Sequence, residues 1–148
     1  MIFSRKRKKS ERPKSVLGDA LFRFDNIYGK ILKNIINPIK EKKRLNQKKA
    51  DILVQDATDD LDSILEDISK DNFKTDYRSD KIRDTVINMI DILKEMLHKF
   101  KSLGYDAEKI EEQNLLKEVD KIDEKHQQIE EKMKEIGSDY QEYGIKKV

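Results

Sequence analysis

The chain has 148 residues, of which 42% are charged and 36% are hydrophobic, and it contains no cysteine. Average globular domains are about 45–50% apolar and about 25% charged. This chain therefore has little core material for a compact α/β domain, whereas long helices with one apolar stripe each can use its composition. The lack of cysteine excludes disulfides, thiolate metal sites and a cysteine nucleophile.

The charge is distributed unevenly along the chain. Residues 1–49 hold 16 Lys/Arg and 4 Asp/Glu, whereas residues 50–148 hold 16 Lys/Arg and 26 Asp/Glu. This asymmetry predicts an anionic partner for the basic part. No apolar stretch of a signal peptide follows the basic start, and no run approaches the ~18 apolar residues of a membrane span. We therefore expect a cytoplasmic protein that is at most peripheral to a membrane.

Residues 1–14 are expected to form a disordered basic arm, because cations at this density repel one another out of a compact shape. A solubilising tail is the simplest interpretation. The functional interpretation is that the arm contacts anionic lipid or nucleic acid. Its candidate anion-binding residues are Arg5, Lys6, Arg7, Lys8, Lys9, Arg12 and Lys14.

Residues 15–36 are predicted to form an amphipathic helix with Ser15 as its N-cap. Its apolar face repeats at spacings of four and three and comprises Leu17, Leu21, Phe24, Tyr28, Ile31 and Ile35. Two interpretations are open. The helix is either a further member of a helical bundle, or it lies in a membrane interface and presents this face to lipid or a partner.

The pair Asn37-Pro38 predicts a break, because Asn is a preferred N-cap and Pro a preferred first helical residue. A kinked continuous helix remains open. The next helix is predicted over 38–70, with an acidic second half. Its first part carries a second candidate anion-binding surface, continuous with the arm if helix 15–36 folds back, made by Lys40, Lys42, Lys43, Arg44, Lys48 and Lys49.

The clearest pattern is a heptad-like stripe over 79–103, typical of a helix packed in a coiled-coil or bundle manner. Its members are Ile82, Val86, Met89, Leu93, Met96, Phe100 and Leu103. Further apolar residues widen this face, so we expect two neighbouring helices. Ser79 is the predicted N-cap, Gly104 the C-terminal stop, and Asp106 the N-cap of a last helix over 106–136. The short turn between these two helices predicts that they are antiparallel neighbours. Residues 137–148 are expected to form a flexible tail.

Two short patterns, Glu95-x-x-His98 and Asp123-x-x-His126, resemble halves of a di-iron helical site. In an antiparallel hairpin turning near residue 104, however, the two histidines would lie ~22 Å apart along the axis. We therefore predict no metal site and treat His126 as a polar residue on the apolar stripe. No catalytic set or glycine-rich phosphate loop stands out, so we expect no cofactor and no enzymatic activity.

These features predict an all-α protein: an antiparallel up-down bundle of three long helices plus an N-terminal amphipathic helix. The favoured function is a helical adaptor or scaffold. Residues 1–49 would dock on an anionic membrane, and the acidic bundle would contact a protein partner or a second copy, giving a homo-oligomer. The alternative is non-specific nucleic-acid binding through the arm and the 40–49 stripe. A third hypothesis is self-assembly of the basic and acidic parts.

Overall fold

The computed structural model describes residues 16–70 and 77–136, and every regular element in these ranges is helical. The elements are α1 (Val16–Ile31), the π-helix η3 (Leu32–Ile36), α2 (Asn37–Lys40), α3 (Gln47–Lys70), α4 (Tyr77–Ser102), α5 (Ala107–Glu112) and α6 (Lys117–Ile136). The expected arm, the Ser15 cap and the C-terminal tail lie outside the described residues.

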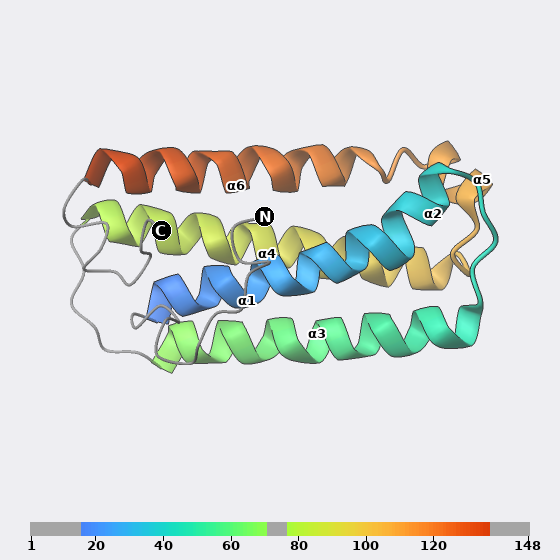
Figure 1. Ribbon diagram of the computed structural model, residues 1–148, viewed down its shortest axis with the longest axis horizontal. Coiled ribbons are helices and arrows are strands. Elements are labelled where there is room, and N and C mark those ends of the chain that lie inside the picture. The colour runs from blue at the N-terminus through green and yellow to red at the C-terminus, as the bar shows by residue number, and fades with distance from the viewer. Residues whose placement is uncertain (1–15, 71–76, 137–148) are drawn as a thin grey trace, which may run out of the picture.

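The long helices α1, α3, α4 and α6 lie side by side along the length of the molecule (Figure 1). Helix α1 packs against α3 and α4, and α4 also packs against α3 and α6. In Figure 1 successive long helices run in opposite directions, so α2, the 41–46 connection and α5 gather at one end. The all-helical prediction is confirmed for the described residues.

The apolar stripe predicted for the central helix forms the middle of the core. Helix α4 begins at Tyr77, so Ser79 lies inside its first turn and is not the residue before the helix. The side chains of Ile82, Val86, Met89, Leu93, Met96 and Phe100 are buried, whereas Leu103 is half-buried. The width of this face corresponds to contacts with α1, α3 and α6.

Helix α1 contributes its entire apolar face to the same core. Leu17, Leu21, Phe24, Tyr28, Ile31 and Ile35 are all buried, with at most 8% of any of them exposed. The helix is therefore packed among the others in this structure. Burial of an aromatic or large aliphatic side chain is worth about 1.5–3 kcal/mol, so this face stabilises the fold.

The predicted break at Asn37-Pro38 is wrong. Asn37 is helical, with φ −62° and ψ −44°, and its N–H donates to Leu32 O in a π-helical turn. Proline lacks an N–H, and its ring would clash with the carbonyl of Asn34 in a regular helix. The wider turn of η3 before Pro38 accommodates the ring. The chain leaves the helix only after Lys40, and α3 starts at Gln47.

The last helix is interrupted, contrary to the prediction of one helix over 106–136. The N–H of Leu115 donates to Ile110 O, and that of Asn114 to Glu111 O. Asn114 has φ 55°. This is a Schellman motif, in which Asn tolerates the left-handed backbone. Leu115 and Ile110 are both buried beside it, so the interruption brings α6 into its packed position.

The predicted turn after the central helix is confirmed. Gly104 has φ 64°, and the N–H of Tyr105 donates to Phe100 O in a second Schellman motif. Asp106 Oδ1 then accepts from the N–H groups of Glu108 and Lys109, which makes it the N-cap of α5. The chain therefore reverses over three residues at the end where α2 and α3 meet.

Candidate anion-binding surface

The basic residues of the 40–49 stripe are exposed at one end of the molecule. We call Lys40, Lys42, Lys43, Arg44, Lys48 and Lys49 the basic loop surface. Its ion pairs within the described residues are Lys42–Glu111 at 3.4 Å and Lys43–Glu41 at 3.0 Å, with side chains 59–70% exposed. Exposed pairs of this kind contribute about 0–1 kcal/mol, so they compete weakly with an external anion.

The connection that carries these cations has a defined backbone. The N–H of Lys42 donates to Ile39 O, and that of Lys43 to Pro38 O. Lys42 itself has φ 59°, which completes another Schellman motif. Asn46 then caps α3, because its Oδ1 accepts from the N–H of Lys49 at 3.0 Å. Lys42, Lys43 and Arg44 therefore lie between the end of α2 and the start of α3. Lys40 is the last residue of α2, and Lys48 and Lys49 lie in the first turn of α3.

Two hydrogen bonds tie the start of α3 to the 103–106 turn. Gln47 Nε2 donates to Gly104 O at 3.2 Å, and the Tyr105 hydroxyl donates to Asp51 Oδ1 at 2.7 Å. Burial, together with the bond to Asp51, raises the pKa of Tyr105, so it stays a donor at neutral pH. These ties hold the two connections in a constant relative position.

A hollow of about 690 Å³ lies between these two connections. One wall consists of the loop residues Lys42, Lys43, Arg44, Leu45 and Gln47, and the other consists of Gly104, Tyr105, Asp106, Ala107 and Glu108. The walls therefore differ in charge. Cations line the loop side, and the two carboxylates line the α5 side.

The start of α1 and the basic loop surface lie at opposite ends of the bundle. The arm joins α1 at Val16, whereas Lys40 is at the far end of the continuous helical segment α1–η3–α2. At 1.5 Å per residue this segment is about 36 Å long. Helix α1 is packed lengthwise, so the point where the arm is attached lies opposite the basic loop surface (Figure 1). The arm itself lies outside the described residues, so the expected continuity of the two basic segments stays a prediction.

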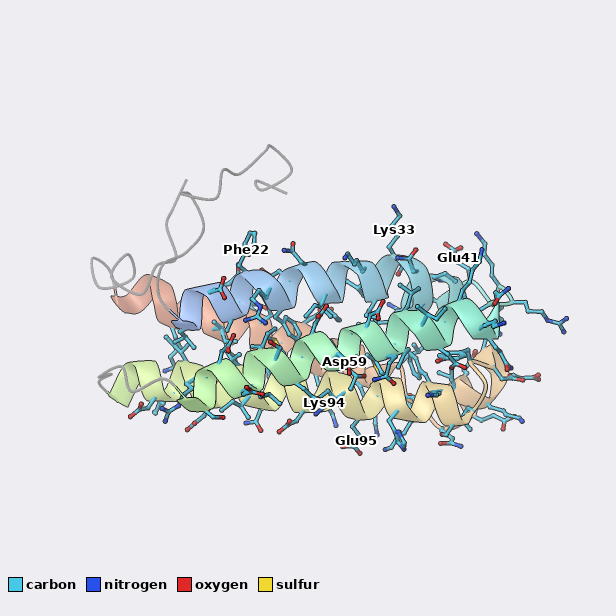
Figure 2. The ribbon with its side chains drawn as sticks, turned by 90° about the horizontal axis from the view of Figure 1, so that it is seen from below. Phe22, Lys33, Glu41, Asp59, Lys94 and Glu95 are labelled. Carbon is cyan, nitrogen blue, oxygen red and sulfur yellow. The ribbon has the colours of Figure 1, made fainter. Side chains whose placement is uncertain are left out.

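The predicted apolar face for a membrane or partner is also not accessible. Its six residues, Leu17 to Ile35 at the spacings given above, are core residues. Figure 2 shows Lys33 on the outer side of this helical segment, pointing away from the neighbouring helices, and Phe22 points to the same side. In this conformation the face is covered, because α1 packs it against α3 and α4.

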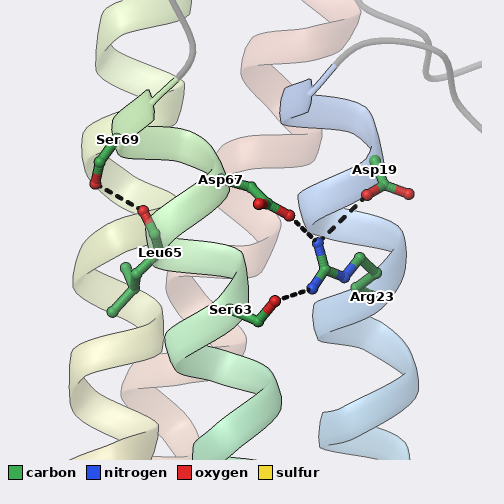
Figure 3. Close-up of polar contacts among 6 residues, drawn as sticks. All are labelled: Asp19, Arg23, Ser63, Leu65, Asp67 and Ser69. Atoms are coloured by element: carbon green, nitrogen blue, oxygen red, sulfur yellow. Dashed lines mark hydrogen bonds and ion pairs between the residues drawn. The ribbon is translucent and has the colours of Figure 1, made fainter.

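Polar contacts attach α1 to α3. Arg23 Nη1 lies 2.7 Å from Asp67 Oδ2 and 3.5 Å from Asp19 Oδ2, and Arg23 Nη2 donates to Ser63 Oγ at 3.0 Å (Figure 3). The planar guanidinium suits this forked arrangement. It fixes the lengthwise position of α1 on α3, which apolar contacts alone specify less strictly.

Another polar group joins α1 to α6. The Tyr28 hydroxyl donates to Asp123 Oδ1 at 2.9 Å, and His126 Nε2 lies 2.7 Å from Asp25 Oδ1. A hollow of about 550 Å³ beside them is lined by Asp25, Tyr28, Asp123, His126, Gln127, Glu130 and Glu131. His126 is 27% exposed, so it lies at the edge of the apolar stripe and not within it.

The residues of the two di-iron-like patterns do not come together. Glu95 and His98 are exposed on α4, and Glu95 points away from the packed helices (Figure 2). Within residues 16–70 and 77–136, no group of three potential metal ligands is close enough to hold an ion. Over the same ranges, no helix combines the length and the hydrophobicity needed to cross a membrane.

Neither a protein-family model, nor a curated protein, nor a solved structure matches this chain.

The cations were predicted from the sequence, but the residues that give the hollow beside them its shape were not. Asn46, Gln47 and Tyr105 give the hollow its shape. One of them carried a local signal, because Asn46 is a good N-cap four residues before the stripe that begins at Ala50. The contacts of Gln47 and Tyr105 join residues more than fifty positions apart, so no local pattern indicates them.

Proposed function

We propose that the protein is a non-enzymatic helical adaptor that docks on an anionic membrane surface through its basic loop surface, assisted by its N-terminal arm. The observation that carries the proposal is the exposure of all six cations of this surface at one end of the molecule. Cations near an anionic leaflet contribute about 1 kcal/mol each, so a group of this size supports measurable binding.

The mode of membrane contact differs from the one that the sequence favoured. Because the apolar face of α1 is in the core, contact with lipid headgroups replaces insertion of this helix. Ile52 is the one large apolar side chain exposed among the described residues, at 57%, and it lies one turn after Lys48. Single exposed apolar residues are common on protein surfaces, so the membrane proposal rests on the six cations.

The architecture in this proposal is an up-and-down four-helix bundle formed by α1–α2, α3, α4 and α5–α6. The bundle holds the basic loop surface at one end and presents an acidic flank along α3, where Asp56, Asp59 and Asp60 are exposed. This flank would be repelled by the same membrane. It therefore faces outward and is available to a protein partner or to a second copy.

The proposal is tested by sedimentation of the full chain with vesicles of phosphatidylcholine alone and with 30% phosphatidylserine, at low and high salt. We expect binding only to the anionic vesicles, weakened by salt as screening predicts. A parallel titration with duplex DNA examines the alternative. Binding to DNA with a steep salt dependence, and none to vesicles, would replace the membrane with nucleic acid as the partner.

A further inference from the structure

The hollow at the basic end has walls of opposite charge, which a purely anionic ligand does not require. Lys42, Lys43 and Arg44 line one side, and Asp106 and Glu108 line the other. Its volume of about 690 Å³ lies in the range of small-molecule sites. Two such walls suit a ligand that carries both a negative and a positive group.

The cationic wall is suited to a phosphate group. Arg44 is exposed and makes no ion pair within the described residues, and its guanidinium is a bidentate phosphate donor. Lys42 and Lys43 are held by weak exposed pairs with Glu111 and Glu41. Exchange of these carboxylates for a phosphate costs little, because exposed pairs are worth about 0–1 kcal/mol.

The carboxylate wall is suited to an ammonium group. Asp106 Oδ1 is occupied by the N–H groups of Glu108 and Lys109. The side chain of Glu108 is exposed and makes no ion pair or hydrogen bond within residues 16–70 and 77–136. Glu108 lines the hollow opposite the three cations and forms no ion pair with them, so its carboxylate is available to a ligand cation.

The hollow is also preorganised. The Gln47–Gly104 and Tyr105–Asp51 hydrogen bonds hold its two walls together, so a ligand that bridges them binds without ordering a loop. We propose that this hollow binds the headgroup of an aminophospholipid, with the phosphodiester against Lys42, Lys43 and Arg44 and the ammonium against Glu108. Among aminophospholipids, phosphatidylserine also carries a net negative charge, which suits the cations of the basic loop surface. The inference rests on the proposed membrane function and names its lipid class.

The test compares two lipids of equal net charge. Phosphatidylserine and phosphatidylglycerol each carry one net negative charge, but only phosphatidylserine has an ammonium. The full chain is titrated with phosphatidylcholine vesicles that contain the same fraction of either lipid. We expect binding about twofold to fivefold tighter to phosphatidylserine, because an exposed ion pair is worth up to about 1 kcal/mol. Equal affinity for the two lipids would overturn the lipid class while leaving anionic docking intact.

Glu108→Gln provides the residue-level test, and Glu112→Gln on the same short helix is its matched control. Glu112 is exposed but does not line the hollow. We expect Glu108→Gln to abolish the preference without weakening binding to phosphatidylglycerol, and Glu112→Gln to retain it. A preference that survives Glu108→Gln would contradict the assigned site.

A soluble headgroup separates this inference from the membrane proposal. Glycerophosphoserine added to the full chain should shift the backbone amide resonances of Gly104 and Ala107, and glycerophosphoglycerol should shift them less. These shifts without vesicle binding would show a site for a soluble phosphoamine and overturn the membrane proposal. Vesicle binding without these shifts would overturn the site.

Discussion

His126 Nε2 lies 2.7 Å from Asp25 Oδ1 where α6 meets α1, and Nδ1 of the same ring lies 3.6 Å from Glu130 Oε1. Both ring nitrogens thus face carboxylates, an arrangement that suits the imidazolium form. The hydrogen bond to Asp25 raises the pKa of His126 against the opposing effect of burial. Tyr28, Asp123 and Glu131 complete the surroundings of the ring.

This contact predicts a pH-dependent contribution to stability. Because the pKa is raised on folding, the contribution is fully present below the unfolded pKa of about 6.5 and is lost as pH rises through the folded pKa. We expect His126→Gln to lower the free energy of unfolding by about 1 kcal/mol at pH 5.5 and by less at pH 9. Urea denaturation at both pH values measures this.

The exposed His98 on α4 provides a control for the loss of a histidine, and His98→Gln should have little effect at either pH. Asp25→Asn should reproduce the pH dependence of His126→Gln, since it removes the same pair from the other side. A loss that is equal at pH 5.5 and pH 9 would show that His126 acts by packing alone.

Replacement by alanine should have opposite effects on stability at two of the glycines. Gly29 is exposed inside α1, and nothing lies within 4 Å of a Cβ added there, so Gly29→Ala should stabilise by about 0.5–1 kcal/mol. Gly104 has φ 64°, and its Cβ would lie 3.0 Å from Gln47 Nε2. Gly104→Ala should therefore destabilise by about 1–2 kcal/mol. Thermal unfolding of both variants checks the sign, and matching signs would contradict the described turn.

The left-handed residue at the start of the basic loop predicts a stabilising glycine. Lys42 has φ 59°, and a non-glycine residue there costs about 1–2 kcal/mol. Lys42→Gly should therefore raise the free energy of unfolding by about 1 kcal/mol, despite the loss of the exposed pair with Glu111. Lys40→Gly removes the same charge from the helical end of α2 and should lower stability instead. Chemical denaturation of the two variants distinguishes backbone strain from charge.

Arg23 and Asp67 are expected to be energetically coupled across α1 and α3. A double-mutant cycle with Arg23→Lys and Asp67→Asn should give about 0.5–1 kcal/mol of coupling, because the guanidinium fork also binds Ser63. The more exposed pair Lys43–Glu41 is the reference, and its coupling should be close to zero. Equal coupling energies in both cycles would contradict the view that Arg23 links α1 to α3 more strongly than an ordinary surface pair does.

The helices were predictable from the sequence where a long periodic stripe meets a strong local signal. The stripe from Ile82 to Phe100 is such a case, and so is the turn at Gly104 and Asp106. The errors arose where local signals compete with packing. Asn37-Pro38 has the composition of a helix start, but the burial of Ile35, Ile36 and Ile39 keeps the chain helical through a π-turn.

The candidate site was predictable in its charges but not in its shape. The six cations are evident in the sequence, and the structure exposes all of them. The hollow beside them depends on Tyr105 reaching Asp51 and on Gln47 reaching Gly104. These are contacts between distant segments, which follow from the packing of α3 on α4. The accessibility of the α1 face likewise depended on whether neighbouring helices were available to cover it.

The most direct measurement compares two triple variants on vesicles that contain 30% phosphatidylserine. The first replaces Lys42, Lys43 and Arg44 with Gln, and the second replaces the exposed Lys30, Lys33 and Lys81 with Gln, which changes the net charge equally. Docking through the basic loop surface predicts a loss of affinity of about 100-fold for the first variant, at about 1 kcal/mol per cation, and a small loss for the second. Equal losses, or a larger loss for the second variant, would contradict it.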